Sequence, residues 1–133
     1  MADYKSELTV ITKAKDLCGY IMTVTQKSPK QYRYTFTTRL QNLSLDVIEK
    51  LYRANMVYVQ PGKDRDVARR KEFQSSAMAD LDLLDYFSYL AMEQKCILPK
   101  QYEQIAKQIT ECKGYLGAWI NSDKKRLQPQ QRL

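Results

Sequence analysis

The side chains of this sequence that are candidates for chemistry are three cysteines and a cluster of aspartates. The chain contains no histidine. The absence of histidine removes the commonest general base and every Ser-His-Asp or Cys-His arrangement. Cys18, Cys96 and Cys112 lie far apart and belong to no Cys-x-x-Cys pair, so neither a zinc site nor a thioredoxin-type site is predicted. We interpret them as small apolar residues of helices, and their odd number favours a reducing compartment.

The aspartate cluster consists of Asp80, Asp82 and Asp85, and it invites a metal or an acid–base hypothesis. A di-iron bundle needs Glu-x-x-His pairs, which a chain without histidine cannot supply. On a helical wheel Asp82 and Asp85 face solvent, whereas Asp80 falls within the apolar arc, where a carboxylate requires a cationic partner. We therefore predict that Asp80 forms an ion pair with Arg39 or Arg53, within the chain or between subunits. No catalytic residue, metal or cofactor is predicted, and we expect that the protein is not an enzyme.

Three short connections separate the elements that carry these residues. They contain Pro29, Pro61 and Pro99, and proline disfavours a helical conformation of the residue before it. The stretches between them have the apolar period of helices. The predicted helices span residues 8–27, 31–60, 64–97 and 100–121. Because such short connections join antiparallel neighbours, the sequence predicts an all-α, up-down-up-down four-helix bundle.

The length of 133 residues suits a single domain, which we place at residues 1–126. The remaining residues, 127–133, are polar and contain a proline, so we expect a disordered tail. No signal peptide is predicted, because no apolar stretch follows a basic start. No apolar run approaches the ~18 residues of a membrane span. We expect a cytoplasmic protein without membrane contact. The glycine motifs of a nucleotide-binding loop are absent, and no small-molecule substrate is predicted.

The second and third predicted helices are apolar on two sides, unlike the first and the fourth. In the second helix Leu43 and Leu51 belong to the main apolar stripe, while Leu45 and Tyr52 lie nearly opposite. Such a helix must bury both sides, and one four-helix bundle offers a single core. We therefore predict an interface between subunits. Its predicted residues are Tyr34, Leu45, Ile48, Tyr52, Met56, Leu83, Tyr86 and Leu90.

Basic residues outnumber acidic ones by 22 to 15, which gives a formal net charge of +7. Residues 27–39 and 124–133 together contain eight basic residues and no acidic one, and the rest is near neutral. Such clusters suit a phosphate backbone through counterion release and steering, although solvated helix ends have the same composition. The candidate nucleic-acid-binding residues are Lys63, Arg65, Arg69, Arg70, Lys71, Lys124, Lys125 and Arg126 at one pole, and Lys27, Lys30 and Arg33 at the other.

The fourth predicted helix carries the run Leu116-Gly117-Ala118-Trp119-Ile120, preceded by Pro99, Tyr102 and Ile109. This pattern resembles the bacterial "four helix bundle protein" family, which includes the accessory variability determinant (Avd) of diversity-generating retroelements. The resemblance extends over the bundle from about Leu8 to Arg126. It also includes the runs Leu45 to Tyr52 of the second helix and Leu83 to Tyr86 of the third.

The resemblance implies a homopentameric barrel of four-helix bundles with a positively charged surface. The retroelement members associate with a reverse transcriptase and its template RNA, support error-prone cDNA synthesis and have no catalytic residues of their own. By this resemblance, the basic residues named above would contact RNA or cDNA. Members encoded within ribosomal RNA insertions are one alternative. A protein-binding scaffold whose charge confers only solubility and a metal- or ligand-binding bundle enzyme are two others.

Overall fold

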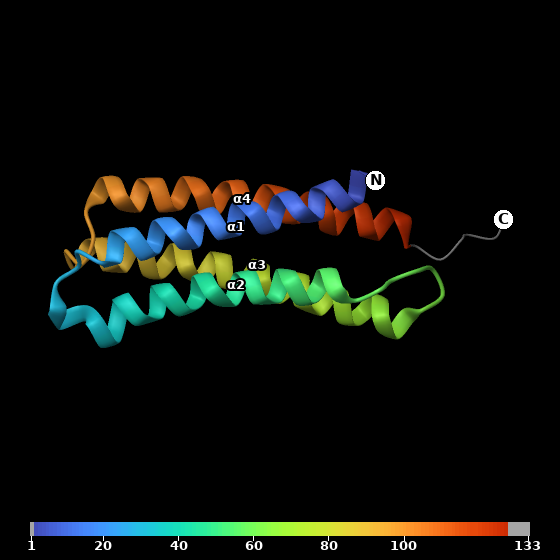
Figure 1. The fold of residues 1–133 in the computed structure, drawn as a ribbon, viewed down its shortest axis with the longest axis horizontal. Helices are drawn as coiled ribbons and strands as arrows, with labels where there is room; N and C mark the ends of the chain where they lie inside the picture. Colours follow the sequence, from blue (N-terminus) through green and yellow to red (C-terminus); the bar gives the residue numbers. More distant parts are fainter. Residues whose placement is uncertain (1, 128–133) are drawn as a thin grey trace.

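The computed structural model describes the backbone of residues 2–127 and the side chains of residues 9–127. This part of the chain forms four α-helices and contains no strand. They are α1 (Ala2–Thr25), α2 (Thr38–Met56), α3 (Asp64–Glu93) and α4 (Pro99–Arg126), and two short turns, η1 (Lys30–Tyr32) and η2 (Arg33–Thr37), precede α2. Consecutive helices run in opposite directions, with α1 beside α4 and α2 beside α3 (Figure 1). The prediction of an all-α four-helix fold is confirmed.

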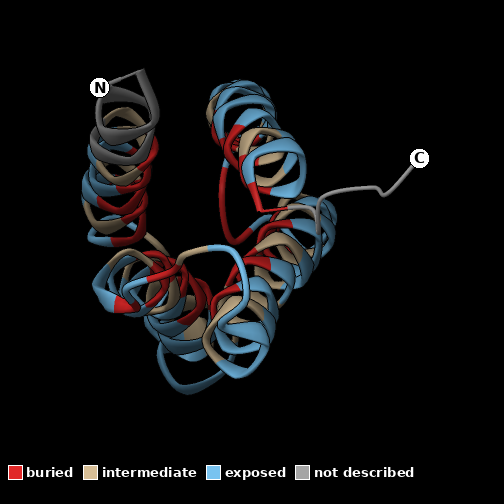
Figure 2. Ribbon diagram, turned by 90° about the vertical axis from the view of Figure 1, so that its right-hand side faces the viewer, coloured by how far each residue is buried: buried red, intermediate tan, exposed pale blue. Residues whose placement is uncertain are grey.

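Each helix turns an apolar face towards the centre of the bundle, where the buried residues gather (Figure 2). Leu17 of α1, Leu43 of α2, Leu84 of α3 and Trp119 of α4 belong to this core. Burial of an apolar side chain of this size contributes about 1.5–3 kcal/mol, so the matching of four such faces holds the helices together. The three cysteines are buried and unpaired, in agreement with their interpretation as apolar residues.

The entry into α2 differs from the single helix predicted over residues 31–60. The chain first makes a 3₁₀ turn and then a π-helical turn, η2, before α2 begins. Phe36 packs against the edge of the core, but Tyr34 is 84% exposed. Tyr32 fixes the turn, since its hydroxyl donates a hydrogen bond of 2.8 Å to a backbone carbonyl of the α3–α4 connection. A five-residue π turn shifts the register of the apolar stripe, and the α-helical period used for the prediction does not include this shift.

The end of α2 also comes before the predicted residue 60, because the next residues are extended. Val57 has φ −77° and ψ 117°. Val57 and Val59 are buried, whereas Tyr58 between them is 77% exposed. This alternation is characteristic of extended chain, and three residues are too few to distinguish it from a helical pattern in the sequence.

Val57 and Val59 pack against Leu127 in a small second cluster at the end of the bundle. Leu127 is therefore buried, and the prediction that a disordered tail begins at this residue is wrong. The rest of the predicted tail, 128–133, lies outside the described residues. The cluster fixes the α2–α3 connection against the end of α4.

The end of α3 is a Schellman motif, and it lies before the end of the predicted helix 64–97. The amide of Lys95 donates to the carbonyl of Met92 at 2.9 Å, and the amide of Cys96 donates to the carbonyl of Ala91 at 2.8 Å. Lys95 has a φ of 66°, the left-handed conformation that this motif requires. The motif turns the chain back, so that Cys96 is buried.

The outer ends of the first and last helices extend beyond their predicted bounds. α1 begins at Ala2 instead of residue 8 and ends at Thr25, and α4 continues from the predicted end at residue 121 to Arg126. The longer α4 places Asp123 on the face that meets α3. None of the described helices combines the length and the apolar character needed to cross a membrane.

Candidate nucleic-acid interface

The start of α3 and the end of α4 meet at one end of the bundle (Figure 1). Arg70 of α3 approaches Asp123 of α4, with 2.9 Å between Nε and Oδ2, and Lys71 and Lys124 line the same small pocket. The structure therefore brings together the two basic segments that the sequence placed at one pole. We call the exposed basic residues of this end the α3–α4 pole. They are Lys63, Arg65, Arg69, Lys71, Lys124, Lys125 and Arg126.

Arg70 differs from the other predicted contacts of this pole because its side chain is buried. The residue is 5% exposed, and its guanidinium lies 4.8 Å from the centre of the Trp119 ring. An arginine paired with a buried carboxylate is not available to a phosphate at the surface. The prediction that Arg70 contacts nucleic acid directly is therefore corrected: Arg70 holds Asp123 in place beneath the pole.

Asp123 is the centre of a buried polar network between the two helices. Gln74 donates its side-chain N–H to Oδ2 at 3.0 Å, and Arg126 donates to Oδ1 at 3.0 Å. Gln74 itself is 2% exposed. Sequence reasoning missed both Gln74 and Asp123. The available signal was the spacing in α4, where Asp123 follows Leu116 and Ile120 along the apolar stripe.

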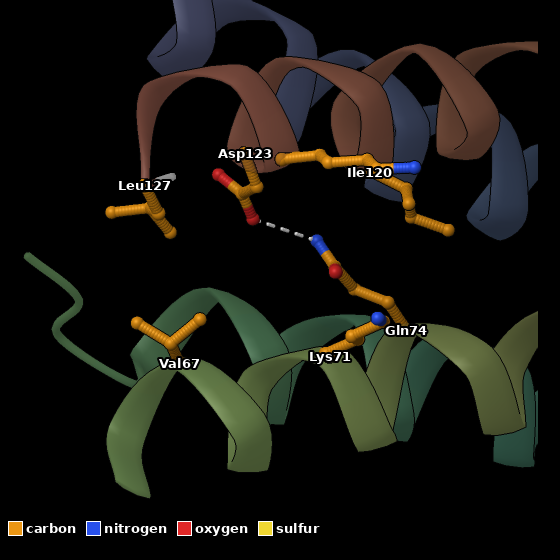
Figure 3. Close-up of a pocket in the computed structure, with 7 residues that line it drawn as sticks. Val67, Lys71, Gln74, Ile120, Asp123 and Leu127 are labelled. Carbon is orange, nitrogen blue, oxygen red and sulfur yellow. Dashed lines mark hydrogen bonds between the residues drawn. The ribbon is translucent and has the colours of Figure 1, made fainter. Parts of the chain in front are cut away.

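A pocket of about 180 Å³ lies beside this network, between α3 and α4. Figure 3 shows the hydrogen bond that joins Gln74 to Asp123 at this pocket, with apolar side chains from both helices around it. The pocket is lined by Val67, Lys71, Gln74, Ile120, Asp123, Lys124 and Leu127. Its interior is thus mainly apolar with a fixed polar pair, and two lysines belong to its lining.

The cations of the α3–α4 pole differ in whether they contact other side chains of the protein. Arg126 pairs with Asp123, and the guanidinium of Arg69 lies 6.0 Å from the centre of the Phe73 ring. The other five are exposed and form no ion pair with any residue that the structure describes. They are Lys63, Arg65, Lys71, Lys124 and Lys125. Unpaired cations gathered at one end of a helix bundle create the positive potential that attracts phosphates.

The opposite pole also gathers its predicted residues. Lys27, Lys30 and Arg33 are exposed and line one hollow of about 200 Å³, between the end of α1 and the turns before α2. The hydroxyl-bearing residues Ser28 and Thr37 contribute to the same lining. The three cations therefore converge on one place rather than pointing apart.

The predicted subunit interface lies mostly on the outside of the single chain. Six of its eight residues are exposed, namely Tyr34, Leu45, Tyr52, Met56, Leu83 and Tyr86. Ile48 and Leu90 are half-buried, and Ile48 packs against the core of its own chain. Ile48 therefore contributes to the core of its own chain as well as to the predicted interface face. The association of subunits remains a prediction.

Asp80 forms the predicted kind of ion pair with a different partner. Its Oδ2 lies 2.6 Å from Nζ of Lys50 on α2, so the prediction of Arg39 or Arg53 is wrong. Arg39 lies over an aromatic ring of α3, and Arg53 pairs with a carboxylate one turn earlier in α2. The helical wheel placed this half-buried carboxylate on the apolar face, but several cations of α2 were within reach of it.

Asp82 and Asp85 connect α3 with α4. Lys113 donates to Asp82, and the hydroxyl of Tyr102 donates to Oδ1 of Asp85 at 2.8 Å. Burial of Tyr102, together with the hydrogen bond and the negative charge of Asp85, raises the pKa of Tyr102 to about 12. Within the described residues, no group of three His, Cys, Asp or Glu side chains is placed to hold a metal ion.

No family model and no curated protein matches this chain. Among solved structures, a protein of unknown function from the S23 ribosomal protein family of Bacteroides thetaiotaomicron VPI-5482 has a similar fold, with a TM-score of 0.74. The two chains are 14% identical, and the similarity covers 87% of this chain and 98% of that one. At this identity the similarity supports the four-helix fold alone.

Proposed function

We propose that this protein is a non-enzymatic accessory protein of a diversity-generating retroelement. In this role it binds the reverse transcriptase and the template RNA or cDNA through its basic surfaces. The observation that carries the proposal is the α3–α4 pole, where five exposed cations have no acidic partner among the described residues. The retroelement setting itself comes from the resemblance in α4, around Leu116 to Ile120.

The engagement of the reactive side chains supports an accessory role rather than a catalytic one. The cysteines are buried, and burial raises the pKa of the Cys112 thiol to about 12, whereas a nucleophilic cysteine needs a lowered pKa. Asp80 and Asp82 are paired with lysines, and Asp85 accepts a hydrogen bond from a tyrosine. These groups connect helices, and the exposed cations are left to bind a partner.

The assembly that we propose, a homo-oligomer and by resemblance a pentamer, uses the exposed apolar residues of α2 and α3. Several exposed large apolar side chains on the same two helices are typical of an interaction site. Association through the sides of the bundles would leave both ends free and would repeat each basic pole once per subunit. Repeated poles bind one nucleic-acid chain more tightly than a single pole does.

The name of the structural relative favours a second candidate. It places that protein in a ribosomal protein family, and four-helix-bundle proteins encoded within ribosomal RNA insertions are the corresponding alternative for this chain. The two candidates differ in the partner that the protein meets, a reverse transcriptase or a ribosomal component. Co-expression with each partner, followed by purification, distinguishes them.

The first test is the affinity for a structured RNA, titrated from low to physiological salt. If phosphates are neutralised, the logarithm of the association constant falls linearly with the logarithm of the salt concentration, with a slope of several units. Replacement of Lys71 and Lys124 by Glu should weaken binding and reduce the slope by about two. The matched control replaces Lys27 and Lys30 by Glu at the opposite pole.

Each outcome of this test has a definite meaning. A larger effect at the α3–α4 pole supports it as the main contact, and an equal effect shows that the two poles contribute alike. The absence of binding even at low salt would contradict direct contact with nucleic acid. Binding of a co-expressed reverse transcriptase with weak salt dependence would then favour the protein-binding scaffold.

A further inference from the structure

We propose that the pocket between α3 and α4 receives the base of one unpaired guanine nucleotide, while Lys71 and Lys124 hold the adjoining phosphate. This inference rests on the proposed function, because its premise is that the α3–α4 pole binds RNA or cDNA. The inference specifies which part of the nucleotide the α3–α4 pole recognises and which base the pole prefers.

The size of the pocket suits a single ring system. Its volume is about 180 Å³, and an apolar cavity of about 150 Å³ is sufficient to hold benzene. Pockets for drug-sized ligands occupy roughly 300–1,000 Å³, so a whole nucleotide does not fit. A base can enter only if its sugar and phosphate remain outside.

The walls of the pocket suit the faces of a base. Val67 lies on α3, and Ile120 and Leu127 lie at the end of α4 and just after it, so apolar groups approach from both sides (Figure 3). Unstacked bases are commonly held between apolar or aromatic side chains, which replace the stacking that the base has lost. An inserted ring would thus lie against apolar groups of both helices, beside the contact of Val67 with the cluster that contains Leu127.

The polar pair within the pocket presents hydrogen-bond acceptors. Oδ2 of Asp123 already meets Arg70 and Gln74, so its Oδ1, which accepts a hydrogen bond from Arg126, has the greater remaining capacity. Oε1 of Gln74 accepts no hydrogen bond from the described residues. Arg70 and Arg126 hold Asp123 from two sides, so the acceptors are fixed before a ligand arrives. The Watson–Crick edge of guanine carries neighbouring N–H donors at N1 and N2, which complement adjacent acceptors. Uracil carries only one such donor.

The two lysines complete the match with a nucleotide. Lys71 and Lys124 come from opposite helices, are exposed and have no ion-pair partner among the described residues. Ammonium groups bind phosphate oxygens and also the O6 and N7 acceptors of guanine. The nucleotide would thus meet acceptors inside the pocket and cations at its edge.

The experiment compares three short single-stranded RNAs that differ at one central position, measured by fluorescence anisotropy at one salt concentration. The first contains only uridine, the second has a central guanosine and the third has an abasic residue there. We expect the wild-type protein to bind the guanosine RNA about fivefold or more tightly than the other two, as a good bidentate base contact does.

Two variants locate the effect. Val67→Phe fills the pocket and should remove the guanosine preference without changing the affinity for oligouridine. Gln74→Leu removes the amide acceptor and should reduce the same preference. Ile11→Phe, at a half-buried position of α1 outside the pocket, is the matched control and should retain it. Circular dichroism and unchanged affinity for oligouridine show that each variant is folded.

The outcomes separate this inference from the proposed function. Equal affinity for all three RNAs overturns the base pocket but leaves RNA binding by the pole intact. A guanosine preference that survives in Val67→Phe also overturns it, because the base is then recognised elsewhere. If none of the RNAs binds even at low salt, both the proposed function and the pocket fail.

Discussion

The ion pair between Arg70 and Asp123 gives the basic pole a fixed foundation. Both side chains are less than a tenth exposed, and burial of two charges is costly unless further hydrogen bonds compensate. Here Gln74 and Arg126 also donate to the carboxylate, and the Trp119 ring covers the guanidinium. The pair therefore fixes the relation of α3 to α4 at the point where the exposed lysines emerge.

Removal of one partner should be strongly destabilising. We expect Arg70→Met to lower the free energy of unfolding by about 3–5 kcal/mol, because Asp123 would keep a buried charge without its main counter-charge. Urea unfolding followed by circular dichroism measures the effect. Lys113→Ala breaks the exposed pair with Asp82 and should cost less than about 1 kcal/mol. Similar small losses in both variants would show that the Arg70 pair contributes little.

The raised pKa of Tyr102 leads us to predict a loss of stability at high pH. Its pKa is raised from 10.0 to about 12, so the unfolded chain releases this proton more readily than the folded protein does. The contribution of protonated Tyr102 to the free energy of unfolding is fully present below about pH 10 and is lost as the pH rises from about 10 towards 12. The free energy of unfolding of Tyr102→Phe, measured by urea unfolding, should therefore fall less steeply over this pH range than that of the wild type. Tyr58→Phe, at a 77% exposed tyrosine, is the control and should follow the wild type.

At the scale of elements, the left-handed turn after α3 has a residue that is poorly suited to it. Lys95 has a φ of 66°, which costs a residue with a Cβ roughly 1–2 kcal/mol and costs glycine almost nothing. Lys95→Gly should raise the free energy of unfolding by about 1 kcal/mol, since the greater freedom of glycine in the unfolded chain offsets part of the gain. Lys100→Gly, near the start of α4, should not stabilise. A loss of stability in Lys95→Gly would mean that the lysine side chain has a role of its own.

Periodicity predicted the helices well where one face is buried and less well where the backbone changes conformation. The apolar spacing in α2 and α4 identified core residues such as Leu43 and Trp119. It did not identify the π turn before α2 or the extended segment at Val57, because each leaves apolar residues at intervals that a helix also allows. Such changes are set by contacts with distant segments, as when Tyr32 bonds to the α3–α4 connection.

The positive charge of the candidate site could be predicted from the sequence, but its buried ion pair and its pocket could not. The basic clusters and the direction of the helices placed Lys71 near Lys124, because this depends only on connectivity. The burial of Arg70 depends on a partner, Asp123, that the predicted helix end at residue 121 excluded. The pocket depends on how α3 and α4 pack side chain against side chain, and a single sequence does not specify that geometry.

For the whole molecule, the candidate binding cations and most of the exposed apolar residues occupy different parts of the bundle. The cations of the two poles lie at its ends, whereas the exposed apolar residues follow α2 and α3 along its side, and the two sets meet in a hollow that Tyr52 and Met56 share with Arg69. In α2 these residues are Leu45, Tyr52 and Met56, seven and four residues apart, so they share one face. Association through this side would leave the ends accessible, so the proposed assembly and the proposed nucleic-acid binding would use mostly different surfaces of one subunit.

This separation makes Tyr52 the best residue for testing assembly. Tyr52 is 58% exposed, so Tyr52→Asp should leave helicity unchanged. It should place a charge within the interface and separate the subunits, because loss of a central aromatic contact costs an interface about 2 kcal/mol or more. Light scattering coupled to size-exclusion chromatography gives the mass of the assembly. Tyr115→Asp, at an exposed tyrosine of α4, is the matched control and should retain the oligomer.

The same variant connects assembly with the basic poles. If subunits repeat the α3–α4 pole along one RNA, the separated Tyr52→Asp subunit should bind RNA more weakly even though every lysine is present. Its salt dependence should also decrease, since fewer phosphates are neutralised by each bound particle. Unchanged mass would show that this face is not the interface, and loss of helicity would place Tyr52 in the core. Separated subunits with undiminished RNA affinity would show that each bundle binds RNA independently.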